Sequence, residues 1–296
     1  MQPRFRNWHV QLALLPAWLI VVFAYLGTMV FTVRMSFTSS KGIPIMDDVG
    51  LRQYDRLFHT DRWTISVENI LIFGLLFILG CLVLGFLLAV FVDRLARFEN
   101  TLRTIFLYPL AMSFVVTGLV WQWILNPALG LQANVRNWGW TSFTFDWLEQ
   151  GDRAIYLVAF AGIWQSCGLV MAIMLAGLRG VDQELWKAAR IDGIPTWRIY
   201  LHIIIPALAP MFITATLLLA TAVVRSYDIV VAMTAGGPGI SSEVPAKFVI
   251  DFLFTRQNIG LATAAATVML ITVLVVLMPW LYLQYFRSAP GARRAA

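Results

Sequence analysis

Two charged residues, Arg225 and Asp228, stand inside an apolar stretch that is long enough to cross a membrane. A charge in hydrocarbon is costly, so such residues usually face a polar cavity or pair with each other. Three residues apart on one helical face, these two side chains are placed to pair. The pattern leaves three roles open: a structural ion pair, a contact with a substrate or gate, and proton coupling through Asp228. The last is the least favoured, because an arginine beside an acid keeps it ionised.

The sequence offers little from which to build a catalytic site. The three histidines, His9, His59 and His202, are scattered, with neither an HExxH pattern nor clustered carboxylates beside them. A metal site or a catalytic triad therefore has no basis. No GxxxxGK[ST] pattern occurs, which excludes a P-loop for nucleotides. Cys81 and Cys167 lie in apolar runs and predict no disulfide. We expect neither an enzyme nor a cofactor or metal site in this chain.

Composition predicts a membrane protein. The 296 residues are 59% hydrophobic and 13% charged, whereas soluble domains carry about 25% charged residues. A spanning helix needs about 20 mostly apolar residues. Six runs meet this need, at roughly 11–34, 68–92, 104–125, 154–178, 205–233 and 260–286. We expect an all-α integral membrane protein with six transmembrane helices in a single domain, 1–296.

Basic residues are biased toward one side of this arrangement. The amino end, the 93–103 and 179–204 loops and the tail hold twelve basic residues against five acids, whereas the other loops hold nine of each. The bias predicts a multi-pass inner-membrane protein with both termini in the cytoplasm. The outer loops are then 35–67, 126–153 and 234–259. Because there are only three lysines and no basic run, the net charge of +6 does not indicate a nucleic-acid partner.

Two outer loops have a character of their own. Residues 134–149 are rich in Trp and Phe, which suits either the headgroup level of the bilayer or a docking surface for a water-soluble partner. Residues 234–259 open with a glycine-rich turn, and their apolar run, 248–254, is too short to span. A re-entrant or amphipathic segment at the outer face fits this run.

The cytoplasmic loop 179–206 has an internal pattern. Asp182 is placed to cap a run of helix formers, Gln183–Ile191. Gly193 offers a helix stop, and a second short amphipathic piece follows at Thr196–Ile205. We predict a helix, a tight glycine turn and a second helix. The first helix would present Ala188 and Ala189 as a small, flat surface that another protein can approach closely.

The run AARIDG at 188–193, followed by Ile203 and Pro206, resembles the EAA loop of ABC-importer permeases. In that family the loop carries a coupling helix that sits in a cleft of the ATP-binding subunit. We call 179–206 the EAA-like loop. The resemblance implies ATPase coupling for Trp186, Lys187, Ala188, Ala189, Arg190, Asp192, Gly193 and Pro206. Lys187 stands where the family has its leading glutamate, so a salt bridge at that position is not expected to carry over.

A second pattern narrows the resemblance. RSYD at 225–228, followed by TAGGP at 234–238, is similar to the sugar-importer permeases related to the maltose permeases, and the six-span plan agrees over nearly the whole chain. The resemblance implies the type I ABC-importer permease fold and a carbohydrate substrate. It also implies a second homologous permease, two ATP-binding subunits that hold ATP and Mg, and an external, periplasmic binding protein. The direction of transport, import, is implied by the family alone.

By the same resemblance, the spans on either side of the EAA-like loop line the substrate cavity, with help from the third span. Sugars are bound by aromatic faces and uncharged hydrogen-bonding groups. The candidates are Ser113, Thr117, Trp121, Trp164, Gln165, Ser166, Arg225, Ser226, Tyr227 and Asp228. The alternative for each Ser or Thr is a bond to its own helix carbonyl, and for Trp121 it is an interfacial anchor. Arg225, if it faces the cavity, suits an anionic or strongly polar sugar derivative.

Two other classes of protein remain as alternatives. An ion-coupled secondary transporter would need an intramembrane relay and internal inverted repeats, and neither is evident. A membrane-embedded enzyme would need a catalytic constellation that the chain lacks.

Overall fold

A computed structural model describes residues 8–95 and 98–287. These residues form helices, turns and loops, with isolated β-bridges joining Thr38 to Asp48 and Lys41 to Ile43. The predicted all-α class is therefore confirmed for the described chain. The chain divides into two compact units: a terminal unit, 1–63 with 248–296, and a central unit, 64–247.

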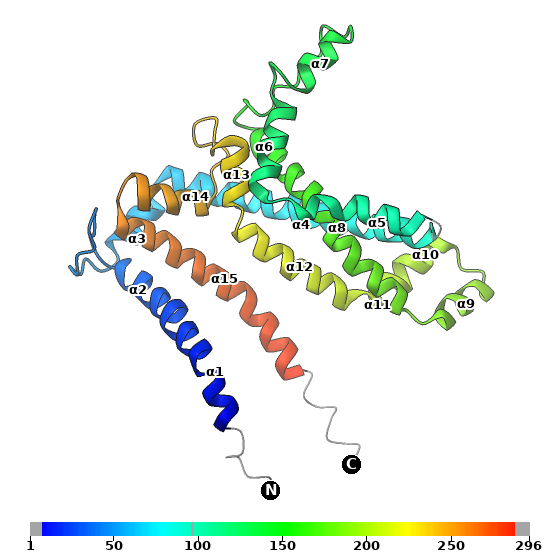
Figure 1. The fold of residues 1–296 in the computed structure, drawn as a ribbon, viewed down its shortest axis with the longest axis horizontal. Helices are drawn as coiled ribbons and strands as arrows, with labels where there is room; N and C mark the ends of the chain where they lie inside the picture. Colours follow the sequence, from blue (N-terminus) through cyan, green and yellow to red (C-terminus); the bar gives the residue numbers. More distant parts are fainter. Residues whose placement is uncertain (1–7, 96–97, 288–296) are drawn as a thin grey trace. The chain divides into compact units, whose positions relative to one another are not determined.

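The terminal unit brings helices from both ends of the sequence together. Its helices are α1 (Trp8–Ile20), the π-helical turn η1 (Val21–Leu26), α2 (Gly27–Met35), α3 (Arg52–Phe58), the π-helical turn η5 (Asp251–Thr255) and α15 (Ile259–Arg287). The long α15 packs against α2 and α3, as Figure 1 shows. Gly260 permits a close approach to α3 and to the loop after α2, because a Cβ there would lie 2.9 Å from Gln53 Nε2 and 2.3 Å from the carbonyl oxygen of Thr38.

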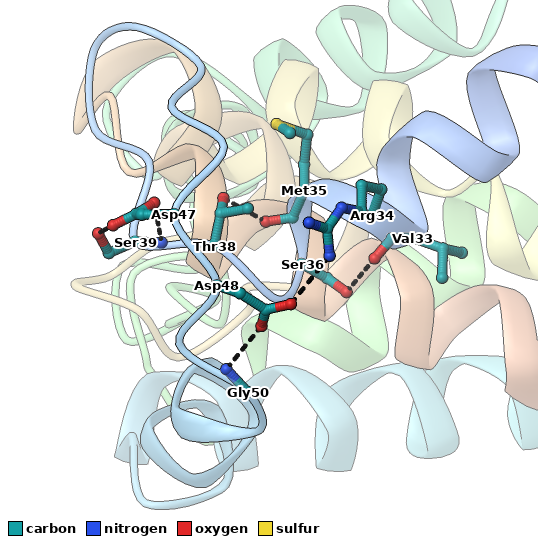
Figure 2. A network of polar contacts seen from close by, with 9 residues as sticks. All are labelled: Val33, Arg34, Met35, Ser36, Thr38, Ser39, Asp47, Asp48 and Gly50. Atoms are coloured by element: carbon teal, nitrogen blue, oxygen red, sulfur yellow. Dashed lines mark hydrogen bonds and ion pairs between the residues drawn. The ribbon is translucent and has the colours of Figure 1, made fainter.

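The loop that follows α2 is folded back by its own polar groups (Figure 2). Asp48 accepts from Arg34 Nη1 and from the Gly50 N–H, both at 3.0 Å, and these contacts, the Gly50 one first, lower the pKa of the Asp48 carboxyl. Asp47 accepts from the N–H and the hydroxyl of Ser39. The Arg34–Asp48 pair is half exposed, so it shapes the loop more than it stabilises the fold.

The central unit holds most of the buried core. Its helices are α4 (Asp61–Arg94, which begins in the terminal unit), α5 (Glu99–Leu107), the 3₁₀ turn η3 (Tyr108–Ala111), α6 (Phe114–Leu125), α7 (Leu131–Asn137), α8 (Ala154–Gly180), α9 (Gln183–Ile191), α10 (Thr196–Ile199), the π-helical turn η4 (Tyr200–Ile204), α11 (Ile205–Ala207), α12 (Ala209–Val224), α13 (Tyr227–Thr234) and α14 (Pro245–Ile250, which ends in the terminal unit). Glycines bring α4 and α8 close together: a Cβ on Gly85 would lie 2.6 Å from the Val170 side chain. The middle of α8 is buried on most sides, so α8 is the central helix of this unit.

Three helical stretches of the described chain are long and apolar enough to cross a membrane: Leu12–Met35, Asp61–Arg94 and Ala154–Gly180. Two bent pairs pass the same test together: Glu99–Ala111 with Phe114–Leu125, bent by 98°, and Thr196–Ala207 with Ala209–Val224, bent by 68°. Counting each bent pair as one span gives five, and α15 adds a shorter apolar helix, Ile259–Val275. The predicted count of six spans stays a prediction.

The third and fifth predicted spans, 104–125 and 205–233, are not the single helices that their apolar composition predicted. Pro109 lies in the 3₁₀ turn that ends the first half of the third span. Leu208 leaves helical geometry, and Pro210 follows in the first turn of α12. Proline lacks an N–H and favours helix starts, so it ends one helical segment and opens the next. A count of apolar residues does not detect these breaks, because the segments on both sides of each break are apolar.

The contact of α8 with α5 gives a stability prediction. A Cβ on Gly168 would lie 2.1 Å from the carbonyl oxygen of Phe106, whereas a Cβ on Gly180 would meet nothing within 4 Å. We expect Gly168→Ala to destabilise the protein by about 1–3 kcal/mol through overpacking. The matched control Gly180→Ala should leave stability unchanged or slightly raised, because Ala is the better helix former. The apparent unfolding temperature in mild detergent measures both, and equal values would contradict this contact.

Candidate functional site

The EAA-like loop folds as predicted, into a helix, a glycine turn and a second helix. Asp182 caps α9, because its Oδ1 accepts the Glu184 N–H at 2.9 Å. Gly193 has a φ of +68°, in the left-handed region that suits glycine. This conformation lets the Ile194 N–H reach the carbonyl oxygen of Ala189 at 3.0 Å, which closes the end of α9. The short α10 follows directly.

The two alanines of α9 do not share a surface, so one part of the prediction is wrong. Ala188 is exposed, whereas Ala189 is only 3% exposed and belongs to the hydrophobic core of the central unit. In an α-helix, neighbouring residues point about 100° apart, and the bundle covers one of the two. The outward face of α9 instead carries Leu185, Ala188 and Ile191, whose two large side chains are 46% and 85% exposed.

Lys187 finds its partner within α9. Its Nζ lies 2.9 Å from Glu184 Oε1, three residues earlier, and both side chains are more than half exposed. An exposed pair of this kind contributes little stability. It does, however, give the lysine a local counter-charge at the position where the resembled family has glutamate.

An ionic network holds the start of the EAA-like loop to the neighbouring helices. Arg179, at the end of α8, lies 2.6 Å from Glu99 Oε2 and 3.8 Å from Asp93 Oδ1. Glu99 also accepts from Arg103 at 3.1 Å. A cavity of about 810 Å³ opens beside this network, and its lining includes Arg179, Trp186 and Tyr200. The start of the loop is thus attached to α4 and α5 by ion pairs, and a cavity lies beside this attachment.

The candidate substrate residues come from three elements that pack together. Gly118 of α6 lies so close to α13 that a Cβ there would be 2.6 Å from the Ala232 Cβ. The rings of Trp121 and Trp164 meet edge to face at 5.6 Å between centroids, which joins α6 to α8. Gln165 adds a second link, because its Nε2 donates to the carbonyl oxygen of Met112 at 2.7 Å. The candidates from α6, α8 and the start of α13 therefore surround one junction.

Arg225 and Asp228 do not form the predicted pair. The helix α12 ends at Val224, and Arg225 leaves α-helical geometry before α13 begins. The two side chains are therefore not on one continuous helical face, and both are exposed. Among the ion pairs of the described residues, none joins these two. Tyr227, between them, is half-buried.

Several candidates carry buried polar atoms without a hydrogen-bond partner in the described chain. These atoms are Thr117 Oγ1, Trp121 Nε1, Gln165 Oε1 and Ser226 Oγ. Thr117 and Ser226 therefore do not bond back to their own helices, the alternative considered for them. A buried polar atom without a partner costs about 1–3 kcal/mol, so such atoms usually bind water or a ligand.

Two other hydroxyl-bearing candidates differ from this set. Ser113 caps α6, because its Oγ accepts the Val116 N–H at 3.2 Å. Ser166 is buried in α8 at 5% exposure.

Trp121 is half-buried and contacts the rings of Phe160 and Trp164, whereas Trp123, two residues later, is 71% exposed.

Sequence reasoning missed Glu99 and Tyr200. Glu99 was counted only as a loop charge, although its spacing of four residues from Arg103 signals a helical pair. Tyr200 contacts Trp186 of α9 and Phe86 of α4. No local sequence pattern predicts these contacts, because the three rings come from three separate segments.

Comparison with known proteins finds a matching family model and similar permeases. The family model described as "Binding-protein-dependent transport system inner membrane component" matches residues 81–287. The chain is 36% identical over 280 residues to a probable ABC transporter permease protein of Pyrococcus horikoshii, covering 94% of this chain and 96% of that protein. It is 31% identical over 277 residues to the xylose/arabinose import permease protein XacH of Haloferax volcanii, covering 92% and 86%.

A solved structure shares the fold. A chain in the crystal structure of a bacterial alginate ABC transporter, in complex with an alginate pentasaccharide-bound periplasmic protein, matches with a TM-score of 0.81. The match covers 97% of both chains at 18% sequence identity. At this identity the likeness shows the fold alone.

The two faces of α9 give a second stability prediction. We expect Ala189→Trp to lower the unfolding temperature of the purified chain, because overpacking a filled core costs about 1–3 kcal/mol. Ala188→Trp, on the exposed face, should leave that temperature unchanged. A thermal melt of each variant in mild detergent tests the difference. If Ala189→Trp were as stable as the wild type, Ala189 would not lie in the core.

Proposed function

Because the chain belongs to the family of binding-protein-dependent transport system inner membrane components, we propose that it forms half of the translocation pathway of an ATP-driven carbohydrate importer. Family membership makes it a membrane-embedded transport subunit of the sugar ABC-permease type, not a catalytic one. In this proposal its partners are a second homologous permease, two ATP-binding subunits that hold ATP and Mg, and an external binding protein.

One observation carries the proposal: Arg225 and Asp228 are exposed at the helix break that interrupts the predicted apolar span, 205–233. A charge at the centre of a spanning helix costs about 2.5–3.5 kcal/mol on insertion scales. Broken backbone at membrane depth is tolerated where it faces protein or a water-filled cavity. The exposed surface around Arg225 and Asp228 is therefore assigned to the pathway, between this chain and its partner permease.

The junction behind that face suits a ligand rich in hydroxyls. Thr117, Gln165 and Ser226 hold polar atoms that lack partners within the described chain, and sugar hydroxyls both donate and accept. The rings of Trp121 and Trp164 supply apolar faces against which a sugar can stack. These atoms are buried in this conformation, so substrate contact requires α6 and α13 to move away from α8. The relative named for xylose and arabinose import supports a carbohydrate as the substrate.

The outward face of α9 is assigned to an ATPase subunit. Leu185, Ala188 and Ile191 form a small apolar stripe on a short helix outside the spans. The two large side chains, Leu185 and Ile191, can enter a cleft on a partner, and the small Ala188 between them allows a close approach. Two other coupling candidates of the loop, Asp192 and Gly193, lie in the turn that follows α9.

The external partner and the orientation complete the proposal. The alginate transporter of similar fold was solved with its periplasmic protein bound, which supports a binding protein for this chain too. The charge bias places both termini and the EAA-like loop in the cytoplasm, in an inner membrane. The aromatic loop that contains the 83% exposed Trp138 would then lie outside.

Purification from native membranes in mild detergent tests the assignment of α9. We expect the wild-type chain to bring down an ATP-hydrolysing subunit. Ala188→Trp should lower the recovered ATPase activity roughly tenfold, which corresponds to about 1.4 kcal/mol of lost binding free energy, without changing the melting temperature of the chain. The control Ala128→Trp, an exposed alanine in the loop after α6, should recover as much ATPase as the wild type. A chain that purifies without any ATPase would refute the importer and favour a secondary transporter.

Uptake into proteoliposomes with saturating binding protein tests the pathway face. We expect Arg225→Ala to raise the substrate concentration for half-maximal uptake roughly tenfold, through the loss of a contact worth about 1.4 kcal/mol. Assembly with the partner subunits should be unchanged. The control Arg52→Ala, at an exposed residue of α3, should transport like the wild type. If Arg225→Ala impaired assembly without altering this concentration, Arg225 would be structural.

A further inference from the structure

A chain of aromatic contacts runs from the EAA-like loop into the bundle. The ring of Trp186, on α9, meets Tyr200 edge to face at 5.3 Å between centroids. Tyr200 meets Phe86 of α4 edge to face at 6.3 Å. Phe86 in turn contacts Phe212 of α12 at 5.7 Å. Three ring contacts thus link α9 to two helices that are remote from it in sequence.

Tyr200 is held at the centre of this chain. The guanidinium of Arg94, at the end of α4, lies 5.5 Å from the centroid of its ring, a distance typical of cation–π attraction. Tyr200 is also the first residue of the π-helical turn η4, between α10 and α11. Such turns are frequent at functional sites in helices. The ring is therefore fixed by its neighbours at the entrance to the bent fifth span.

Few other contacts join α9 to the bundle. Among the α9 residues whose side chains are described, Ala189 is buried and Trp186 is half-buried, while the others are exposed. The cavity of about 810 Å³ borders Trp186, Tyr200 and Arg94, so no packed side chains support the rings on that side. Dispersion contacts require atoms on both sides of an interface. Ala189 and Trp186 are thus the described side chains of α9 that pack on the bundle, and the Trp186–Tyr200 contact is the one that leads to α4 and α12 through rings.

We propose that Tyr200 is a positioning residue that transmits the displacement of α9 to α4 and α12 through its ring. This inference rests on the proposed function, in which an ATPase subunit moves α9. Tyr200 touches neither the ATPase face of α9 nor the candidate substrate residues. Its loss should therefore separate ATP hydrolysis from transport without preventing assembly.

The test uses the complete transporter, with its partner permease, ATPase subunits and binding protein, in proteoliposomes. The measured quantity is the amount of substrate taken up per ATP hydrolysed. We expect Tyr200→Ala to retain bound ATPase subunits and basal ATP hydrolysis while this ratio falls roughly tenfold. Tyr200→Phe should restore the wild-type ratio, because the contacts are made by the ring. The control Leu201→Ala, an exposed neighbour in the same π-helical turn, should behave like the wild type.

A second variant covers the case in which Tyr200→Ala does not fold. Trp186→Leu removes the other ring of the same contact, and we expect it to lower the uptake-to-hydrolysis ratio in the same way. The double variant should be no worse than the more severe single variant, since both remove one contact. An unchanged ratio in a folded variant of either residue, or failure of Tyr200→Phe to rescue, overturns the inference. A wild-type complex without ATP-driven uptake overturns the proposed function itself, which is a separate outcome.

Discussion

Hydrocarbon does not tolerate unpaired backbone or exposed charge, and the central unit is organised around two exceptions to this constraint. One helix breaks before Ser113, and another breaks at Arg225. The helices that follow the two breaks, α6 and α13, pack closely at Gly118. The breaks are therefore brought to one junction, where Gln165 of α8 donates to the Met112 carbonyl oxygen at the first break and polar side chains gather. A single straight helix in either place would leave no such junction.

The long helix α8 connects this junction to the EAA-like loop. Its middle carries Trp164, which contacts Trp121 of α6, and Gln165, which donates to the Met112 carbonyl oxygen just before α6. Its end carries Arg179, which is bound to Glu99 at the start of α5. Gly168 lies between them and permits a close approach of α5. The tight contacts along α8 connect the EAA-like loop to this junction through one continuous helix.

The helix α9 makes one exposed ion pair and two contacts with the bundle, and these differ in how much they stabilise its position. Its ion pair, between Glu184 and Lys187, is exposed and contributes little. The buried Ala189 and the Trp186 ring fix α9 to the bundle, while the opposite face stays exposed. This division explains how a lysine is accommodated where the family has a glutamate, since the charged side chain has no part in the inner contact. It also leaves one face of a well-positioned helix open to a partner.

The sequence by itself determined the helical, membrane-embedded class, the helix–turn–helix of the EAA-like loop and the identity of the polar candidates. These features depend on local composition, capping residues and glycine, all of which act within a few residues. Only the tertiary structure decided that Ala189 is buried while Ala188 is exposed, and that Arg225 and Asp228, as the described residues show them, do not pair with each other. It also decided that Tyr200 joins α9 to α4. Burial and pairing depend on which distant helix covers a residue and on where a helix breaks, and neither is encoded in the spacing of neighbouring residues.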